Sequence, residues 1–204
     1  MEQTTEVTRR ILEGMRVGDR RAFDRFFERH AARILVFIHY NLGPKMRRKL
    51  DAADVLQNLY LRLYEDFAGY LERAQELGTR KALIRWARHE ITEAYRFHFK
   101  AGKRNAAREL SAIEGADSSP LKWQADDAPS VSAQLVRKEE LEKVLTMLRA
   151  LTPHEQTVTV ARVIEGLTAQ EIAERLGKSR TAVQMTIARS RDKLRALAER
   201  ENAR

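Results

Sequence analysis

The chain has 204 residues, 43% of them hydrophobic and 33% charged, so it can form one large or two small globular domains. It has no cysteine, which excludes disulfides and thiolate zinc sites, and its five histidines lack the close spacing of a metal-binding helix. No apolar run approaches the roughly 18 residues of a membrane span, and no secretory signal precedes the first charges. We expect a cytoplasmic protein with no metal, no cofactor and no membrane insertion.

The charge is unevenly distributed along the chain. The net charge of +9 favours a polyanionic partner. Residues 1–104 contain 22 basic and 14 acidic side chains, residues 105–134 contain 2 and 5, and residues 135–204 contain 14 and 10. Two basic blocks therefore flank an acidic segment. A basic surface that only aids solubility is the alternative interpretation.

The first block has the pattern of a helical bundle. Hydrophobic residues from Phe23 to Ile38 recur at three- and four-residue spacing, and Gly43-Pro44 ends that helix. A second helix is predicted from about Asp51 to Tyr70 and a third from about Arg80 to Lys100. Strand alternation is absent.

The third predicted helix has two contrasting faces. Its apolar face holds Leu83, Trp86, Ala87, Ile91 and Ala94. The opposite face holds Arg85, Arg88, His89, Thr92, Arg96 and Phe99. A face that mixes Arg, His and Phe can bind phosphates and stack on exposed bases. A surface helix kept soluble by its arginines is the simpler alternative.

The segment from 105 to 134 is predicted to be a flexible acidic linker, because Ser, Pro, Asp and Ala occur there without periodicity. Its Trp123 docks either on the protein's own surface or on a partner. Helical spacing resumes from Leu135 to Leu151, and Thr152-Pro153 begins another helix with Pro in the favoured first position. We expect about four helices in residues 135–204.

The last two predicted helices form a helix-turn-helix. Thr168 and Glu171 make a capping-box pattern at the start of the first helix, and Gly177 suits a left-handed residue at its end. Ser179 can cap the second helix, which carries mainly basic charges. In this motif the second helix enters the major groove of DNA. An ordinary antiparallel helix pair is the alternative.

Four phrases together resemble the extracytoplasmic-function (group IV) sigma factors of the sigma-70 family of bacterial RNA polymerase. They are AFDRFFERHAARILVFI, DAADVLQNLYLRLYEDFAGY, ALIRWARHE and ALTPHEQTVTVARVIEGLTAQEIAERLGKSRTAVQMTIARSRDKLR. The resemblance implies an all-α fold with a region 2-like domain at 1–104 and a region 4-like helix-turn-helix domain at 135–204. Such proteins bind core polymerase, direct it to the −35 and −10 promoter elements, and open the duplex at the −10 element.

The resemblance assigns three groups of residues. Polymerase docking on the clamp helices of the large catalytic subunit would use Asp54, Gln57, Asn58 and Arg62. Capture of a flipped base of the −10 element by a loop from about Tyr70 to Lys81, and binding of its strand, would use Tyr70, Arg80, Lys81, Arg85, Arg88, His89 and Arg96. Reading of the −35 element would use Arg180, Thr181, Gln184, Met185, Thr186, Arg189 and Arg191.

The chain departs from the family pattern at several of these positions. Asn58 stands where Glu is usual, Ala82 where Trp is common, and His89 where Asn is frequent. Lys or Arg is frequent at the positions of Gln184 and Thr186. The resemblance also implies contact with the flap of the second large subunit. It makes an anti-sigma protein a candidate partner without indicating whether one exists.

Two other functions are compatible with parts of the sequence. A conventional helix-turn-helix regulator without polymerase docking would dimerise and favour palindromic sites, and no obvious dimerisation heptads are present. A metal-dependent nuclease could use Asp51, Asp54, Glu65 and Asp66. Because the last two lie three turns away from the first two, helix caps and surface acids are the simpler interpretation. We expect no enzymatic activity and no catalytic residue.

Overall fold

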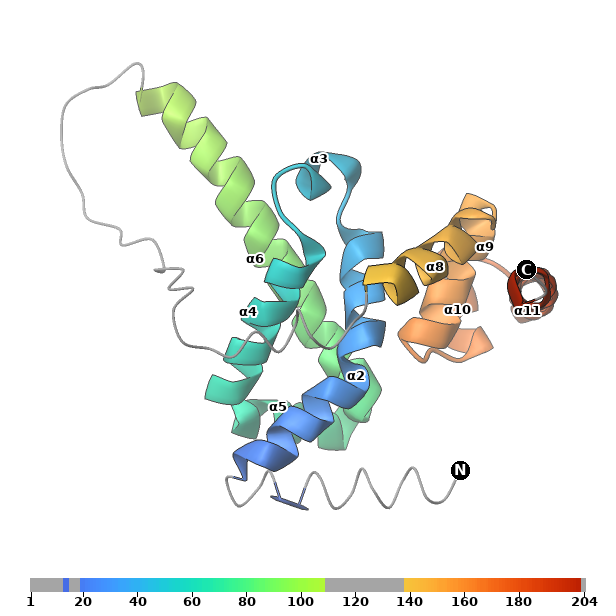
Figure 1. Cartoon of the computed structure of the whole chain (residues 1–204), viewed down its shortest axis with the longest axis horizontal. Coiled ribbons are helices and arrows are strands. Elements are labelled where there is room, and N and C mark those ends of the chain that lie inside the picture. Colours follow the sequence, from blue (N-terminus) through green and yellow to red (C-terminus); the bar gives the residue numbers. More distant parts are fainter. Residues whose placement is uncertain (1–12, 15–18, 109–137, 203–204) are drawn as a thin grey trace.

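The computed structural model describes residues 13–14, 19–108 and 138–202, with side chains for 13–14, 19, 21–98 and 141–200. Over these ranges every regular element is a helix (Figure 1), which confirms the predicted all-α fold. None of the helices described is long and apolar enough to cross a membrane. The predicted linker starts within the last turn of a helix and continues, with Trp123, outside the described residues.

The N-terminal block contains helices α2 (Arg20–Asn41), α3 (Pro44–Arg47), α4 (Ala52–Glu65), α5 (Phe67–Leu77) and α6 (Thr79–Arg108). Carboxylates cap two of their starts: Asp19 accepts a hydrogen bond from the backbone of Arg21, and Asp51 accepts one from Ala53. Helices α2, α4 and α6 pack against one another, and α5 packs along the first turns of α6 (Figure 1).

Aromatic side chains fill much of the core of this block. Phe26, Phe27, Phe37 and Tyr70 are all fully buried. The Tyr70 hydroxyl donates a hydrogen bond to the Thr79 carbonyl at 3.2 Å, which satisfies its polar group inside the core. Burial raises the pKa of Tyr70 well above its ordinary value, so this residue is a neutral structural element.

The region between α4 and α6 differs from the sequence prediction. The second predicted helix, from Asp51 to Tyr70, is interrupted at Asp66, whose backbone leaves the helical region (φ −119°, ψ 54°). Its carboxylate accepts a hydrogen bond from Gly69 N at 3.1 Å and so caps a new helix. The predicted loop from Tyr70 to Lys81 is therefore wrong: α5 occupies most of it, and only the turn at Gly78 (φ +81°) separates α5 from α6.

The C-terminal block contains α8 (Lys138–Arg149), α9 (Pro153–Thr159), a π-helical segment η1 (Val160–Ile164), α10 (Ala169–Leu176) and α11 (Arg180–Asn202). Its own small hydrophobic cluster consists of Val158, Ala161, Leu167, Ile172, Ala173 and Val183. Capping boxes begin α9 and α10, as the sequence indicates for Thr168 and Glu171. The helix-turn-helix is thus held by a small core and by local hydrogen bonds.

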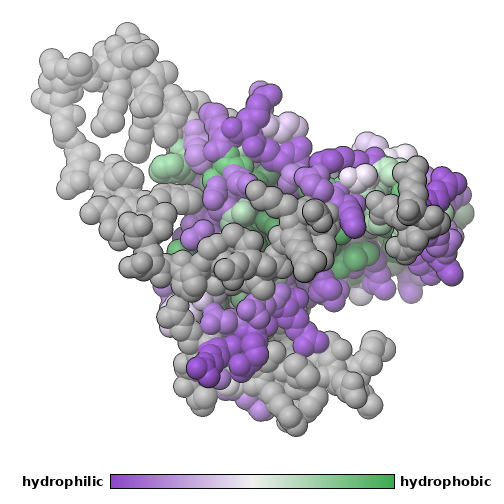
Figure 2. Space-filling view, in the orientation of Figure 1, coloured by the Kyte–Doolittle hydropathy of each residue, from purple (hydrophilic) through white to green (hydrophobic). Residues whose placement is uncertain are grey.

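The two blocks are in contact. Helices α8 and η1 pack on α2, and Figure 1 shows α8 beside α2. Leu148, Leu151 and Val160 belong to the hydrophobic cluster of the N-terminal block. The Tyr40 hydroxyl and Thr157 Oγ1 lie 3.2 Å apart across the same boundary. On the face shown in Figure 2 the described surface is mostly hydrophilic, with separate hydrophobic patches.

Candidate nucleic-acid interface

The helix-turn-helix has the geometry that its sequence predicts. Thr168 Oγ1 accepts a hydrogen bond from Glu171 N at 3.2 Å, and Glu171 Oε2 accepts one from Thr168 N at 2.7 Å. Gly177 adopts the left-handed conformation (φ +61°) that ends α10. Ser179 Oγ accepts a hydrogen bond from Ala182 N at 3.2 Å at the start of α11. These local bonds fix the angle at which α11 leaves the turn.

Helix α11 buries one face and exposes the other. Val183 is 1% exposed, and Ile187 and Leu194 are half-buried on the same side. The predicted −35 residues that are exposed are Arg180, Thr181, Gln184, Met185, Arg189 and Arg191. Thr186 is half-buried and donates its hydroxyl hydrogen bond to the Ala182 carbonyl at 3.0 Å. The structure therefore brings six of these seven side chains to the surface and places Thr186 at the margin.

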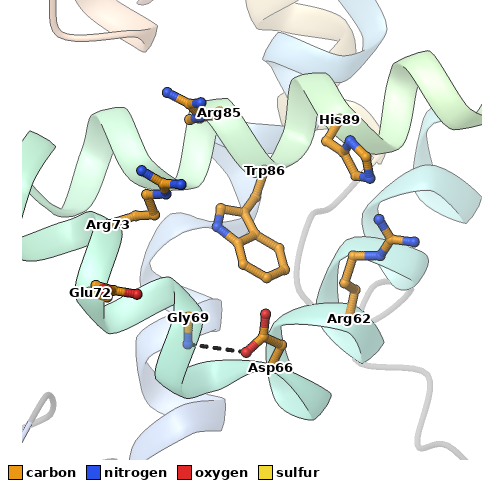
Figure 3. Close-up of a pocket in the computed structure, with 8 residues that line it drawn as sticks. All are labelled: Arg62, Asp66, Gly69, Glu72, Arg73, Arg85, Trp86 and His89. Carbon is orange, nitrogen blue, oxygen red and sulfur yellow. Dashed lines mark hydrogen bonds between the residues drawn. The ribbon is translucent and has the colours of Figure 1, made fainter.

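A groove of about 570 Å³ lies on the N-terminal block between α4–α5 and α6 (Figure 3). It is lined by Arg62, Asp66, Gly69, Glu72, Arg73, Arg85, Trp86 and His89. In Figure 3 the half-buried indole of Trp86 projects from α6 into the space above Asp66 and Gly69. The groove thus combines a flat aromatic surface with arginines and with carboxylate acceptors.

Only part of this groove is predicted from the sequence. Arg85 and His89 were predicted to bind DNA and Arg62 to bind polymerase, whereas Trp86 was expected on the apolar face of its helix and Arg73 was not expected at a site. The sequence does contain a signal that Trp86 belongs to the groove. On the helical wheel, Trp86 lies at the edge of the apolar face that is nearest to His89. No sequence signal indicated that residues of α5 would line the groove, because this segment was predicted to be a loop.

The predicted −10 residues fall into three environments. The exposed ones on α6 are Arg80, Arg85, Arg88, His89 and Arg96. Lys81 is half-buried and forms an ion pair with Glu171 of α10, and Arg88 forms one with Glu165 at 2.7 Å. Tyr70 is fully buried. Its assignment to a DNA-contacting loop is corrected here, because a side chain that fills the core is inaccessible to DNA.

The predicted polymerase residues share one side of α4. Asp54 is exposed, and Gln57 and Asn58 are half-buried. Leu61, which sequence analysis did not single out, lies one turn after Gln57 and is 36% exposed.

Arg62 has a partner within the block. Its Nε lies 3.0 Å from Glu90 Oε1, and the Glu90 side chain is only 8% exposed. Burial raises the pKa of the Glu90 carboxyl, while the nearby Arg62 charge opposes that shift. Arg62 therefore stabilises a buried acid of α6 and also lines the groove.

The four acids of the nuclease hypothesis do not form a common centre. Asp51 and Asp66 cap α4 and α5 by accepting backbone hydrogen bonds. Within the part of the chain that the structure describes, no group of three or more His, Asp or Glu side chains could hold a metal ion. The geometry thus gives Asp51 and Asp66 the capping roles that the simpler interpretation predicts.

Comparisons with known proteins bear on both blocks. Residues 141–194 match the family model for sigma-70, region 4. The chain is 25% identical over 178 residues to the ECF RNA polymerase sigma factor SigD of Mycobacterium tuberculosis, covering 87% of this chain and 77% of SigD. It is 24% identical over 173 residues to the ECF RNA polymerase sigma factor BldN of Streptomyces coelicolor, covering 85% of this chain and 59% of BldN. The matches are thus to sigma-70 region 4 at residues 141–194 and, over most of the chain, to extracytoplasmic-function sigma factors.

The region 4 match begins within α8 and ends within α11 at Leu194, so it includes all of α10, the turn and the first part of α11. The similarity to SigD and BldN extends well beyond that match and takes in the N-terminal block. A solved structure of CnrH in complex with the cytosolic domain of CnrY is 23% identical, with a TM-score of 0.43, covering 95% of this chain and 97% of CnrH.

Proposed function

We propose that this sigma factor divides its work among three surfaces: α4 for polymerase, the α6 groove for the −10 element, and α11 for the −35 element. As an alternative sigma factor, the protein directs transcription initiation. The observation that carries the assignment is the region 4 match on a helix-turn-helix whose second helix exposes a polar and basic face. The partners are RNA polymerase and promoter DNA.

The first turns of α11 support reading of the upstream box. Arg180, Thr181 and Gln184 are exposed there, where a recognition helix reaches base edges. A Gln side chain can pair bidentately with adenine in the major groove. Arg189 and Arg191 lie further along and suit phosphates, which position the protein without carrying sequence information.

The groove beside α6 supports capture of an unstacked base. Stacking on an aromatic side chain such as Trp86 contributes about 1–3 kcal/mol per base. Extruding a base from the duplex costs a few kcal/mol, so one stacked base in this groove offsets much of that cost. Arg73 and Arg85 at the rim can bind the adjoining phosphates. We therefore replace the predicted loop with this groove as the candidate site for the flipped base.

The exposed side of α4 supports polymerase docking. This helix face carries one charged side chain, two amides and one apolar side chain, which belong to Asp54, Gln57, Asn58 and Leu61. We assign this face to the clamp helices of the large catalytic subunit, and the C-terminal block to the flap of the second large subunit. Such a protein acts as a binding factor rather than an enzyme, and it works in the cytoplasm with the polymerase.

A conventional regulator that binds DNA without polymerase is not favoured by the comparisons. Run-off transcription with core polymerase over a genomic promoter library separates the two functions. We expect new start sites that share an upstream and a downstream box and that depend on both core enzyme and this chain. Binding of the chain alone to palindromic sites, with no new start sites, would contradict the proposal.

The docking face has its own test. The double substitution Gln57→Ala with Asn58→Ala should weaken core binding at least several-fold while lowering the melting temperature only slightly, because both side chains are half-buried polar groups outside the hydrophobic core. Gln75→Ala, an exposed glutamine on α5, is the matched control. Normal core binding by the double variant would remove α4 from the docking surface.

A further inference from the structure

Three arginines gather where α2 passes the start of α6. Arg29 and Arg33 are one turn apart on α2, a spacing that puts two side chains on the same side of a helix. Arg80 lies in the first turn of α6, and the two helices pack against each other (Figure 1). Neither Arg29 nor Arg33 belongs to a surface proposed for polymerase or promoter DNA.

A series of contacts fixes this junction of α2 with α6. The ring centroids of His30 and Phe26 lie 4.9 Å apart, and those of Phe26 and Tyr70 lie 5.5 Å apart. The Tyr70 hydroxyl donates a hydrogen bond to the Thr79 carbonyl at 3.2 Å, and Thr79 directly precedes Arg80. The first turn of α6 is thus tied, through aromatic rings, to the part of α2 that carries the other two arginines.

The imidazole of His30 lies within electrostatic reach of all three arginines. Partial burial lowers its pKa to about 4, and the charges of Arg33, Arg29 and Arg80, in this order, add to that effect. Burial and the charge of Arg80 also lower the pKa of the Arg33 guanidinium. All the charges that act on these two groups are positive, so no carboxylate of the described residues offsets the cluster.

Ion pairs do not neutralise the cluster either. In the part of the chain that the structure describes, Arg29, Arg33 and Arg80 form no ion pair, whereas the adjacent Lys81 pairs with Glu171. Arg33 is half-buried, and the other two arginines are exposed. Like charges that are close together and partly removed from water repel one another more strongly than they would in bulk solvent. The cluster therefore favours an anion that can reach it from the exposed side.

We propose that Arg29, Arg33 and Arg80 form a site for a phosphate group, supplied either by a free phosphorylated compound or by the DNA backbone. Guanidinium groups bind phosphate through charge-assisted, often bidentate hydrogen bonds. A phosphate has more oxygens than a carboxylate, so it is better suited to three neighbouring arginines. The site is a property of the free chain, and binding stabilises the folded state because the anion relieves the repulsion among the cations.

Thermal unfolding of the full chain tests the site directly, in chloride and in inorganic phosphate of equal ionic strength. The test variant is Arg33→Gln. The control is Arg21→Gln, at an exposed arginine in the first turn of α2, which makes the same change in net charge. Phosphate at about five times its Kd should raise the melting temperature of wild type and control by about 2–4 °C above that in chloride. Arg33→Gln should gain much less, and in chloride it should melt no lower than wild type.

The NMR titration of the His30 ring is a second measurement, which a general effect of salt on the surface does not change. A phosphate held by the arginines favours the protonated imidazole, so the titration midpoint of His30 should move to higher pH in wild type and in Arg21→Gln. Arg33→Gln should begin from a higher midpoint, because one positive charge is gone, and should show little further change. The remaining histidines serve as internal references.

Binding of a short DNA duplex separates the two sources of the phosphate. If the DNA backbone supplies it, Arg33→Gln should make the salt dependence of duplex binding shallower by about one unit relative to Arg21→Gln. An unchanged salt dependence, together with the effects of inorganic phosphate, would assign the site to a free phosphorylated compound.

Two results would overturn the phosphate site. One is an equal rise of the melting temperature in Arg33→Gln and Arg21→Gln, and the other is a His30 midpoint that phosphate does not move in wild type. If Arg33→Gln unfolds, Arg29→Gln replaces it, because that side chain is exposed and belongs to the same cluster. None of these measurements uses polymerase or a promoter, so their outcome is independent of the run-off transcription that tests the proposed function.

Discussion

The N-terminal block and the helix-turn-helix differ in what holds their helices in place. In the N-terminal block, large side chains such as Phe26, Phe27 and Tyr70 are fully buried. The cluster around α10 is built from smaller groups, including Ile172, Ala173 and Val183. The helix-turn-helix adds the capping box of α10 and a left-handed glycine, and a second capping box begins the preceding helix α9. One region is therefore defined by its core, and the other largely by local backbone hydrogen bonds.

The same contrast applies to ionisable groups. In the N-terminal block His30 is half-buried and Glu90 is buried, and this burial shifts the pKa values of both toward the neutral form. In the C-terminal block, the pKa values of Glu155 and Glu171 are lowered, chiefly because each carboxylate accepts a hydrogen bond from a lysine. Burial in the N-terminal block thus disfavours the charged forms of these side chains, whereas hydrogen bonds from lysines favour the charged carboxylates of the C-terminal block.

The largest expected effect comes from removing a core aromatic. Tyr70→Ala should lower the free energy of unfolding by about 3–5 kcal/mol, because it leaves a cavity beneath α5. Tyr64→Ala, at a side chain that is 46% exposed, should cost far less. Denaturant unfolding of both variants measures the difference. Equal losses would mean that Tyr70 does not sit in the core.

The second effect is a pH dependence of the N-terminal block. Burial, followed by the charges of Arg33, Arg29 and Arg80, lowers the pKa of His30 from 6.5 to about 4. Between these values the unfolded chain binds a proton that the folded chain does not, so stability falls as the pH falls from 6.5 to 4. The loss reaches roughly 3 kcal/mol.

His30→Gln should remove that component. Unfolding free energies of wild type and variant at pH 7 and pH 4.5 give the difference directly, because all other titrating groups are shared. Parallel pH profiles would show that His30 titrates normally and that the burial argument fails.

The third effect separates base reading from phosphate binding on α11. Gln184→Ala should relax preference at one base pair of the −35 element, a discrimination worth about 1–3 kcal/mol. Arg189→Ala should weaken binding to all sequences alike and make the salt slope shallower by about one unit. Holoenzyme affinities for single-base promoter variants at several salt concentrations test both. A change of base preference in Arg189→Ala alone would contradict this placement of the helix.

The smallest effect concerns the local hydrogen bonds of the helix-turn-helix. Thr168→Ala removes the acceptor for Glu171 N and should cost about 1 kcal/mol. Thr181→Ala, an exposed threonine on α11, is the control and should be nearly neutral. Thermal unfolding of both variants measures the difference in their stability. If the two variants are equally stable, the capping box does not hold α10 in the way proposed.

This contrast also explains which parts of the structure could be predicted from the sequence. The helix-turn-helix was predicted closely, because Thr168, Glu171, Gly177 and Ser179 act on backbone groups within a few residues of themselves. Such signals are visible in a one-dimensional pattern.

The N-terminal site was predicted less well, because it depends on packing between distant residues. Nothing local to Tyr70 distinguishes a loop aromatic from one that fills a core beside Phe26. Likewise, the groove exists only because Asp66 restarts a helix that then lies along α6, which brings Arg73 near Trp86. The contacts of Lys81 and Arg88 with the C-terminal block also join residues far apart in the sequence.

The central claim is that the C-terminal block reads the promoter while the N-terminal block opens it with polymerase. The most direct test is permanganate reactivity of thymines in the −10 element of a duplex promoter, measured with core enzyme, with this chain, and with both. We predict reactive thymines only with both, and a strong loss in Trp86→Ala holoenzyme that is largely restored on a premelted template. Reactivity with core enzyme alone, or an equal loss on duplex and premelted templates, would contradict the account.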